Sequence, residues 1–73
     1  MNILGIDPGS IKTGFGVIEA NKLKLSYVAS GCIVTSGDFN NKIFTIFDGI
    51  VNITRKYNID IAVVERVFMR PDR

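Results

Sequence analysis

The sequence has little of what secreted and membrane proteins depend on. It holds a single cysteine, Cys32, so no intrachain disulfide can form. No apolar run approaches the roughly 18 residues that a membrane-spanning helix needs. The N-terminus carries no basic segment and no signal-type cleavage site. We therefore expect a cytoplasmic protein in which Cys32 is a small, buried, apolar residue.

The composition suits one small folded domain. Of the 73 residues, 47% are hydrophobic, which is enough for a globular core and argues against disorder. A chain of this length buries only about 60% of its unfolded surface, so its stability is expected to be marginal. The net charge of +2 permits nucleic-acid binding without requiring it.

Short apolar runs separated by turn signals predict an α/β fold. The first run, Asn2 to Asp7, has no polar alternation, as in a strand with both faces covered. The turn Asp7-Pro8-Gly9-Ser10 follows it. Further strands are expected at Thr13 to Glu19, Leu23 to Val34 and Ile59 to Val67.

Apolar side chains at helical spacing predict one amphipathic helix from about Phe39 to Tyr57. Ser36 or Asp38 can cap its N-terminus, and Asn58 is a suitable residue just past its end. The apolar positions are Phe39, Ile43, Ile46, Phe47, Ile50, Ile53, Thr54 and Tyr57.

The order of these elements predicts the topology. Short connections favour an antiparallel meander for the first three strands, the third of them an edge strand. The helix is then a right-handed crossover that returns the last strand parallel to the first. One helix covers one face of the sheet, so the opposite face is expected to be open in this chain.

Asp7 and Glu65 each close an apolar run, where an α/β sheet places its chemistry. If the first and last strands pair in register, both carboxylates point to the same side, within reach of one Mg²⁺. A pair of such ions would activate a water and stabilise the leaving oxygen in phosphodiester hydrolysis. Two carboxylates are too few to hold two ions. Because the sequence ends at Arg73 and Asp72 falls in the wrong element, we expect the site to be incomplete.

Each of these residues also has a purely structural interpretation. An aspartate before Pro-Gly is more often a turn-former than a metal ligand, and a glutamate at a strand end is usually only solvated. Gly14 and Gly16 share one face of a strand, where glycine is uncommon. A neighbouring backbone or a ligand can approach that face closely.

Four stretches of the sequence together resemble the N-terminal portion of a RuvC-type Holliday junction resolvase. They are Ile3-Leu4-Gly5-Ile6-Asp7-Pro8-Gly9-Ser10, Thr13-Gly14-Phe15-Gly16-Val17-Ile18, Ser30-Gly31-Cys32-Ile33 and Val64-Glu65-Arg66-Val67-Phe68-Met69. The resemblance implies a ribonuclease-H-like fold and a homodimer that uses Mg²⁺ to place paired nicks in four-way junction DNA. The resemblance also implies that the enzyme acts together with a junction-migration helicase complex.

The resemblance assigns roles to three residues of this sequence. It makes Asp7 and Glu65 catalytic metal ligands, and it makes Phe68 a contact to DNA bases. It also implies a further helix, a further strand and a C-terminal helix with two more aspartates, none of which these 73 residues hold. We therefore expect residues 1–73 to form a single, incomplete ribonuclease-H-like domain that is inactive by itself.

Three other interpretations remain open at this point. A YqgF-type nuclease acting on RNA shares the Ile-Asp-Pro-Gly opening. The phosphate-binding lobe of an actin-like ATPase or sugar kinase also begins with a strand, an acidic turn and a glycine-containing second strand. A non-enzymatic remnant that keeps only part of the fold is the third alternative.

Overall fold

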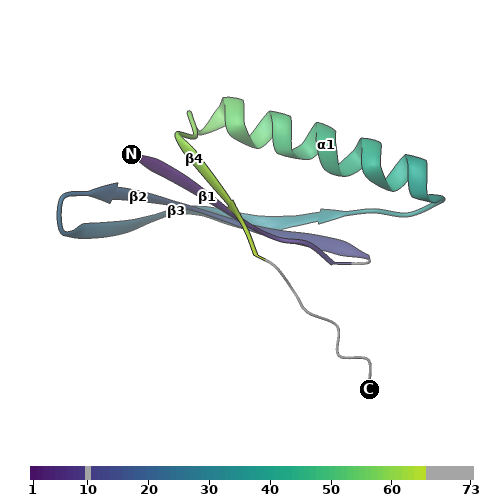
Figure 1. Ribbon diagram of the computed structural model, residues 1–73, viewed down its shortest axis with the longest axis horizontal. Helices are drawn as coiled ribbons and strands as arrows, with labels where there is room; N and C mark the ends of the chain where they lie inside the picture. The colour runs from purple at the N-terminus through teal and green to yellow at the C-terminus, as the bar shows by residue number, and fades with distance from the viewer. Residues whose placement is uncertain (10, 66–73) are drawn as a thin grey trace, which may run out of the picture.

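The computed structural model describes residues 1–9 and 11–65. These residues form four strands and one helix (Figure 1). The elements are β1 (Asn2–Asp7), β2 (Lys12–Asn21), β3 (Lys24–Val34), α1 (Phe39–Lys56) and β4 (Ile61–Val64).

The strands form one mixed sheet in the order β3-β2-β1-β4. β1, β2 and β3 make an antiparallel meander, and β4 pairs parallel to β1 after the crossover through α1. The predicted arrangement of the elements is therefore confirmed, with β3 at one edge. β4 begins two residues later than predicted, because Ile59 and Asp60 still belong to the connection from the helix.

Local sequence accounts for the two tight connections. Lys22 adopts a positive φ of 58° in the two-residue turn between the paired residues Asn21 and Lys24, as the twist of such hairpins demands. Asn58 has a φ of 51° just past the helix. Asparagine tolerates this left-handed conformation better than most residues, and it ends the helix where the sequence predicts.

Both ends of α1 are capped. The Asp38 carboxylate accepts a hydrogen bond from the backbone N–H of Asn41 over 2.9 Å, so Asp38 rather than Ser36 is the N-cap. At the other end the backbone N–H of Tyr57 donates to the carbonyl oxygen of Ile53. Tyr57 is thus the C-cap rather than the last helical residue.

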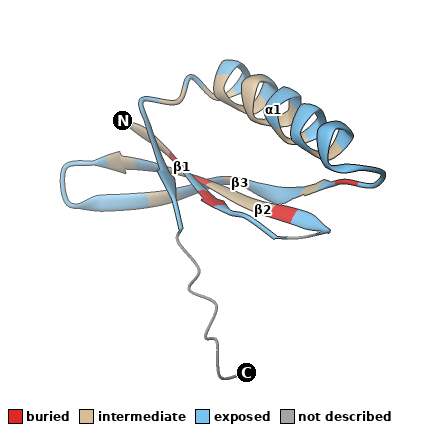
Figure 2. Cartoon of the chain, turned by 45° about the vertical axis from the view of Figure 1, so that its right-hand side comes forward, coloured by how far each residue is buried: buried red, intermediate tan, exposed pale blue. Residues whose placement is uncertain are grey.

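The core lies between α1 and one face of the sheet (Figure 2). Its buried hydrophobic members are Leu4, Ile6 and Val17, at the centre of β1 and β2. Half-buried side chains of α1, chiefly Ile50 and Ile53, pack against them. This is a small core, as expected for a chain of this length.

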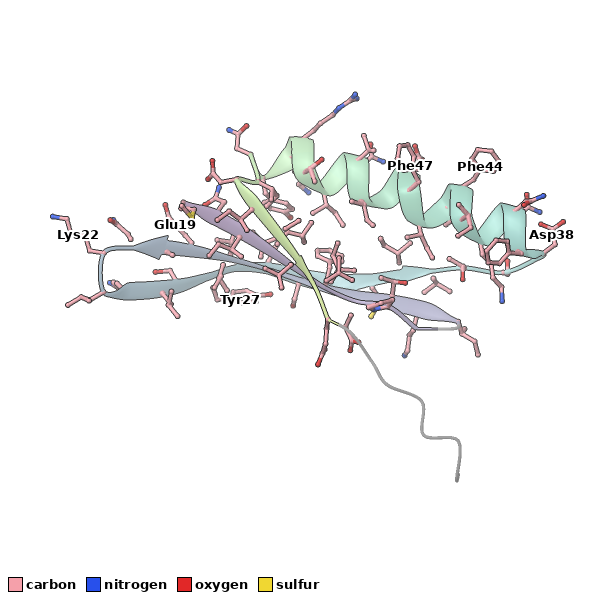
Figure 3. All side chains as sticks on the ribbon, viewed as in Figure 1. Glu19, Lys22, Tyr27, Asp38, Phe44 and Phe47 are labelled. Carbon is pink, nitrogen blue, oxygen red and sulfur yellow. The ribbon has the colours of Figure 1, made fainter. Side chains whose placement is uncertain are left out.

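The apolar stripe of α1 is only partly covered. Phe39, Ile43 and Phe47, which the periodicity places with the apolar positions, are exposed. Phe44 is also exposed, and both Phe44 and Phe47 point away from the sheet (Figure 3). Helical spacing alone therefore overestimated how many side chains of α1 would be buried.

The face of the sheet opposite α1 is open, as expected from a single helix. Two predictions of burial were wrong for this reason. All four residues of β4 are exposed, as are Gly5 and Asp7 of β1, so neither strand is covered on both faces. Cys32, expected to be buried, is exposed on the edge strand β3. Within the described ranges 1–9 and 11–65, no helix is long and apolar enough to span a membrane.

Candidate acidic site on the open face of the sheet

Asp7 and Glu65 lie at corresponding ends of two adjacent parallel strands. The register between β1 and β4 pairs Gly5 with Val63 and Ile6 with Val64. Glu65 follows directly, and its backbone N–H donates to the carbonyl oxygen of Ile6 over 2.8 Å. The same register brings Glu65 beside Asp7, because adjacent strands of a sheet are typically about 4.8 Å apart.

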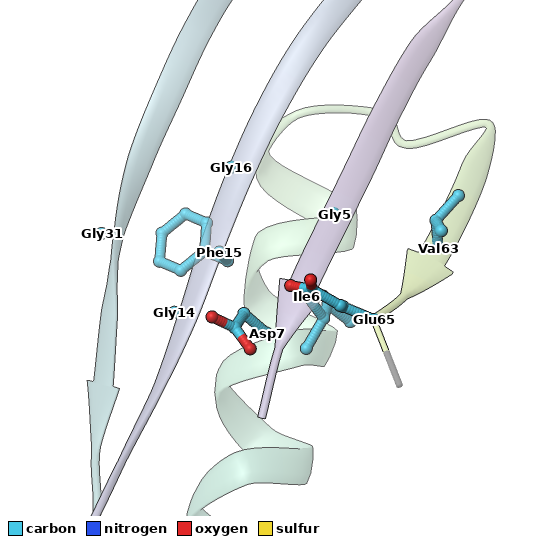
Figure 4. Close-up of a pocket in the computed structure, with 9 residues that line it drawn as sticks. All are labelled: Gly5, Ile6, Asp7, Gly14, Phe15, Gly16, Gly31, Val63 and Glu65. Atoms are coloured by element: carbon cyan, nitrogen blue, oxygen red, sulfur yellow. The ribbon is translucent and has the colours of Figure 1, made fainter. Parts of the chain in front are cut away.

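Alternation along the strands sets the direction of both carboxylates. Leu4 and Ile6 face the core, so Asp7 belongs to the opposite, open face together with Gly5. Both acidic residues are exposed and line the same hollow (Figure 4). The structure therefore brings together the two residues that the sequence singled out.

The hollow has a volume of about 370 Å³ and a floor made largely of glycine. Its lining consists of Gly5, Ile6, Asp7, Gly14, Phe15, Gly16, Gly31, Val63 and Glu65 (Figure 4). The sequence indicated Gly14 and Gly16 as a place of close approach, and the structure puts both in the wall of this hollow. The inclusion of Gly31 was not anticipated, because it depends on the register between β2 and β3.

Strand pairing aligns the glycines with the carboxylate of Asp7. Gly14 lies opposite Asp7, and Gly16 lies opposite Gly5. A side chain added at Gly16 would meet no atom within 4 Å, and one added at Gly5 would meet only a carbonyl oxygen at 3.9 Å. The surface beside the two acids is consequently bare backbone, which a bulky polymer can approach without steric obstruction.

The acidic site is small. No group of three or more histidine, cysteine, aspartate or glutamate side chains that could hold a metal ion occurs within residues 1–9 and 11–65.

Phe68, the third residue that the sequence singled out, lies outside the described residues. Cys32 is paired with Gly14, which places it in the same cross-strand row as Asp7.

The sheet order, the single crossover helix and the acidic ends of β1 and β4 define the first part of a ribonuclease-H-like fold. The family model of the crossover junction endodeoxyribonuclease RuvC matches residues 3–72. The chain belongs to the RuvC family.

Curated relatives carry the same family name. The RuvC of Cupriavidus pinatubonensis is 51% identical over 71 residues, which cover 94% of this chain and 39% of that protein. The RuvC of Cupriavidus taiwanensis is 49% identical, with the same coverage. The chain thus spans about two fifths of the length of the relatives it matches, and it corresponds to their N-terminal part.

A solved structure supports the fold. Thermus thermophilus RuvC in complex with a Holliday junction substrate superimposes with a TM-score of 0.81 at 22% identity, covering 97% of this chain and 45% of that one. The predicted ribonuclease-H-like class is confirmed, and the family match favours the junction resolvase over the YqgF-type and actin-like interpretations.

Proposed function

We propose that this chain supplies the N-terminal part of a magnesium-dependent endonuclease. That enzyme resolves Holliday junctions in DNA recombination and repair by paired phosphodiester nicks. The observation that carries the proposal is that Asp7 and Glu65, directly after the last paired residues of β1 and β4, line one hollow on the open face of the sheet. The family of the chain agrees with this chemistry.

The two acidic residues suit a divalent metal ion. Mg²⁺ prefers carboxylate oxygens, keeps several water ligands, and is often held by one or two carboxylates together with substrate phosphates. Asp7 and Glu65 offer such oxygens at an exposed position, where water and a phosphate group can complete the coordination. We assign both residues as metal ligands and as catalytic residues. When bound, Mg²⁺ supplies Lewis-acid chemistry for phosphodiester hydrolysis.

The remaining residues of the hollow act on the DNA substrate. The bare backbone at Gly5 and Gly16 lets a phosphodiester strand lie close to the carboxylates. We assign Phe68 as a contact to the DNA bases, following the family resemblance, because aromatic rings stack on unpaired bases.

The proposal extends to the assembly in which the chain acts. Because residues 1–73 match about two fifths of the length of their relatives, we infer that they form one incomplete domain with two acidic ligands and do not cleave DNA by themselves. The complete enzyme acts in the cytoplasm as a homodimer on a four-way junction, beside a junction-migration helicase complex. Relatives more than twice as long as the matched segment supply the additional protein that this requires.

A fusion protein tests the proposal directly. Residues 1–73 are joined to the remaining C-terminal segment of the Cupriavidus pinatubonensis relative, and a labelled four-way junction is offered with and without Mg²⁺. We expect paired nicks only with the metal, only with the fusion, and not with its Asp7→Asn variant. Nicking that persists in the Asp7→Asn fusion, or that needs no metal, would overturn the proposal.

A further inference from the structure

A cluster of hydrogen bonds ties the start of β1 to the segment that precedes β4. The backbone N–H of Asn2 donates to Oδ2 of Asp60, and the backbone N–H of Asp60 donates to the carbonyl oxygen of Asn2, both over 2.8 Å. Nδ2 of Asn2 donates to the carbonyl oxygen of Tyr57 over 2.6 Å and, more weakly, to that of Asn58 over 3.5 Å. We call these four bonds the Asn2–Asp60 clasp.

We propose that Asn2 and Asp60 are positioning residues, which set the register of β4 against β1 and thereby place Glu65 beside Asp7. This inference rests on the proposed function, because the pairing matters only if both carboxylates serve one site. The clasp lies at the far end of the strand pair from the acids and does not touch them. Its effect would reach them through the parallel ladder that runs from Ile3 and Ile61 to Ile6 and Val64.

The sequence of β4 does little to specify its own register. Ile61, Ala62, Val63 and Val64 are all apolar and all exposed, so neither polarity nor burial distinguishes one face from the other. Register is weakly specified in such strands, and a slip of one residue turns every side chain to the opposite face. After such a slip, Glu65 would no longer point to the open face with Asp7.

The clasp can fix the register that the sequence of β4 leaves weakly specified. Reciprocal bonds fix Asn2, the first residue of β1, against Asp60, the residue directly before β4, which permits a single alignment. The amide of Asn2 also binds carbonyl groups at the end of α1, where helices leave such acceptors unsatisfied. The helix end, β1 and β4 are therefore joined at one point.

The test uses the 73-residue chain and two NMR readouts. The first is the set of cross-strand contacts of β1, to β4 on one side and to β2 on the other. The second is the broadening of Asp7 and Glu65 signals by Mn²⁺, a paramagnetic ion that binds the same oxygen ligands. The variants are Asp60→Ala, Asp60→Asn and Asn2→Ala, with Asn52→Ala as a control at an exposed asparagine of α1.

We expect Asp60→Ala to shift or abolish the contacts between β1 and β4 while those between β1 and β2 persist. The Mn²⁺ concentration that broadens Glu65 should rise at least about tenfold, as for other residues that orient metal ligands, while Asp7 still responds. Asp60→Asn should restore both readouts, because its amide oxygen can still accept the bond from Asn2. Asn2→Ala should act in the same direction as Asp60→Ala, and Asn52→Ala should change neither readout.

Two results would overturn the inference. One is a wild-type pattern of β1–β4 contacts in Asp60→Ala. The other is a simultaneous loss of the β1–β2 contacts, which would assign Asp60 to overall stability. If Mn²⁺ does not broaden the Asp7 and Glu65 signals of the wild-type chain, that result would count against the proposed metal site. The contacts between β1 and β4 would still decide the role of the clasp.

Discussion

Glu65 donates its backbone N–H to the carbonyl oxygen of Ile6, so the residue that follows β4 is bonded to the residue that precedes Asp7. This single bond continues the parallel ladder one step past the last regular pair. It holds the backbone of Glu65 against β1, and the two carboxylates extend from neighbouring strands toward one hollow. The candidate site is thus built on strand ends rather than on a long loop.

The first prediction concerns the two acids as metal ligands. In the 73-residue chain, Mn²⁺ should broaden the NMR signals of both Asp7 and Glu65. Asp7→Asn and Glu65→Gln keep the shape of each side chain but remove its charge. Each substitution should weaken Mn²⁺ binding by at least about tenfold, because replacing even a residue that only orients a metal ligand lowers metal affinity by this factor.

The control for this experiment is Asp48→Asn, which removes a carboxylate from an exposed position of α1, away from the hollow. It should leave the Mn²⁺ response unchanged. Because Asp7 and Glu65 are exposed, none of the three variants should alter the melting temperature by more than a few degrees. Equal weakening by all three would show non-specific attraction to negative charge, and it would count against a shared site.

The second prediction concerns the core. Leu4 is 0% exposed at the centre of the sheet, and Leu4→Ala should lower the free energy of unfolding by about 2–5 kcal/mol. That loss is comparable with the whole stability of a small domain, so the variant should be largely unfolded by circular dichroism. Leu23→Ala is the matched control: Leu23 is 104% exposed in a turn, and its truncation should change stability by less than about 0.5 kcal/mol.

The sequence predicted the topology well because the deciding signals are local. Pro8 and Gly9 mark the first turn, Asp38 caps the helix, and Asn58 ends it with a positive φ. Each of these residues acts on the backbone next to it: proline fixes φ, glycine and asparagine tolerate positive φ, and the aspartate side chain accepts a nearby N–H. The pairing of Asp7 with Glu65 then followed from alternation and from the parallel return of β4.

Burial was predicted less well, because it depends on which layers are present. An apolar strand such as β4 has the composition of a buried strand, yet it lies at an uncovered edge. The exposure of Cys32 has the same origin, because one helix covers one face of the sheet, whereas Phe47 is exposed because it lies on the side of α1 that points away from the sheet. No local pattern encodes the Asn2–Asp60 clasp either, because its partners lie 58 positions apart in the chain.

The third prediction concerns a buried hydroxyl group. Thr13 is 1% exposed, and its Oγ1 has no hydrogen-bond partner among the described residues. Thr13→Val removes this unsatisfied group at nearly constant volume, and it should raise the free energy of unfolding by about 1 kcal/mol. Chemical denaturation of the two proteins measures the difference.

Thr35 provides the matched comparison. It is also buried, but its Oγ1 donates to the carbonyl oxygen of Ile11 over 3.1 Å. Thr35→Val should therefore lower stability by about 1 kcal/mol, the opposite sign to Thr13→Val. If both substitutions destabilise the chain equally, the hydroxyl of Thr13 has a partner after all, and the explanation from its missing bond is wrong.

The last prediction compares two glycines that line the hollow, Gly16, which faces open space, and Gly31, which packs against a side chain. A side chain at Gly16 would enter open space, whereas one at Gly31 would come within 3.0 Å of the Phe15 ring. Gly16→Val should leave stability unchanged or slightly raised, since valine suits a strand better than glycine. Gly31→Val should lower it by about 1–3 kcal/mol through overpacking.

Function should respond differently from stability. In the fusion protein, the valine at position 16 would occupy the space through which a DNA strand approaches Asp7. We expect junction cleavage by the Gly16→Val fusion to fall by about a hundredfold, because displacing a substrate by roughly 1 Å lowers the rate by about this factor. Gly16→Ala, with a smaller side chain, should fall between wild type and valine. Full cleavage by a stable Gly16→Val fusion would show that DNA does not pass over this floor.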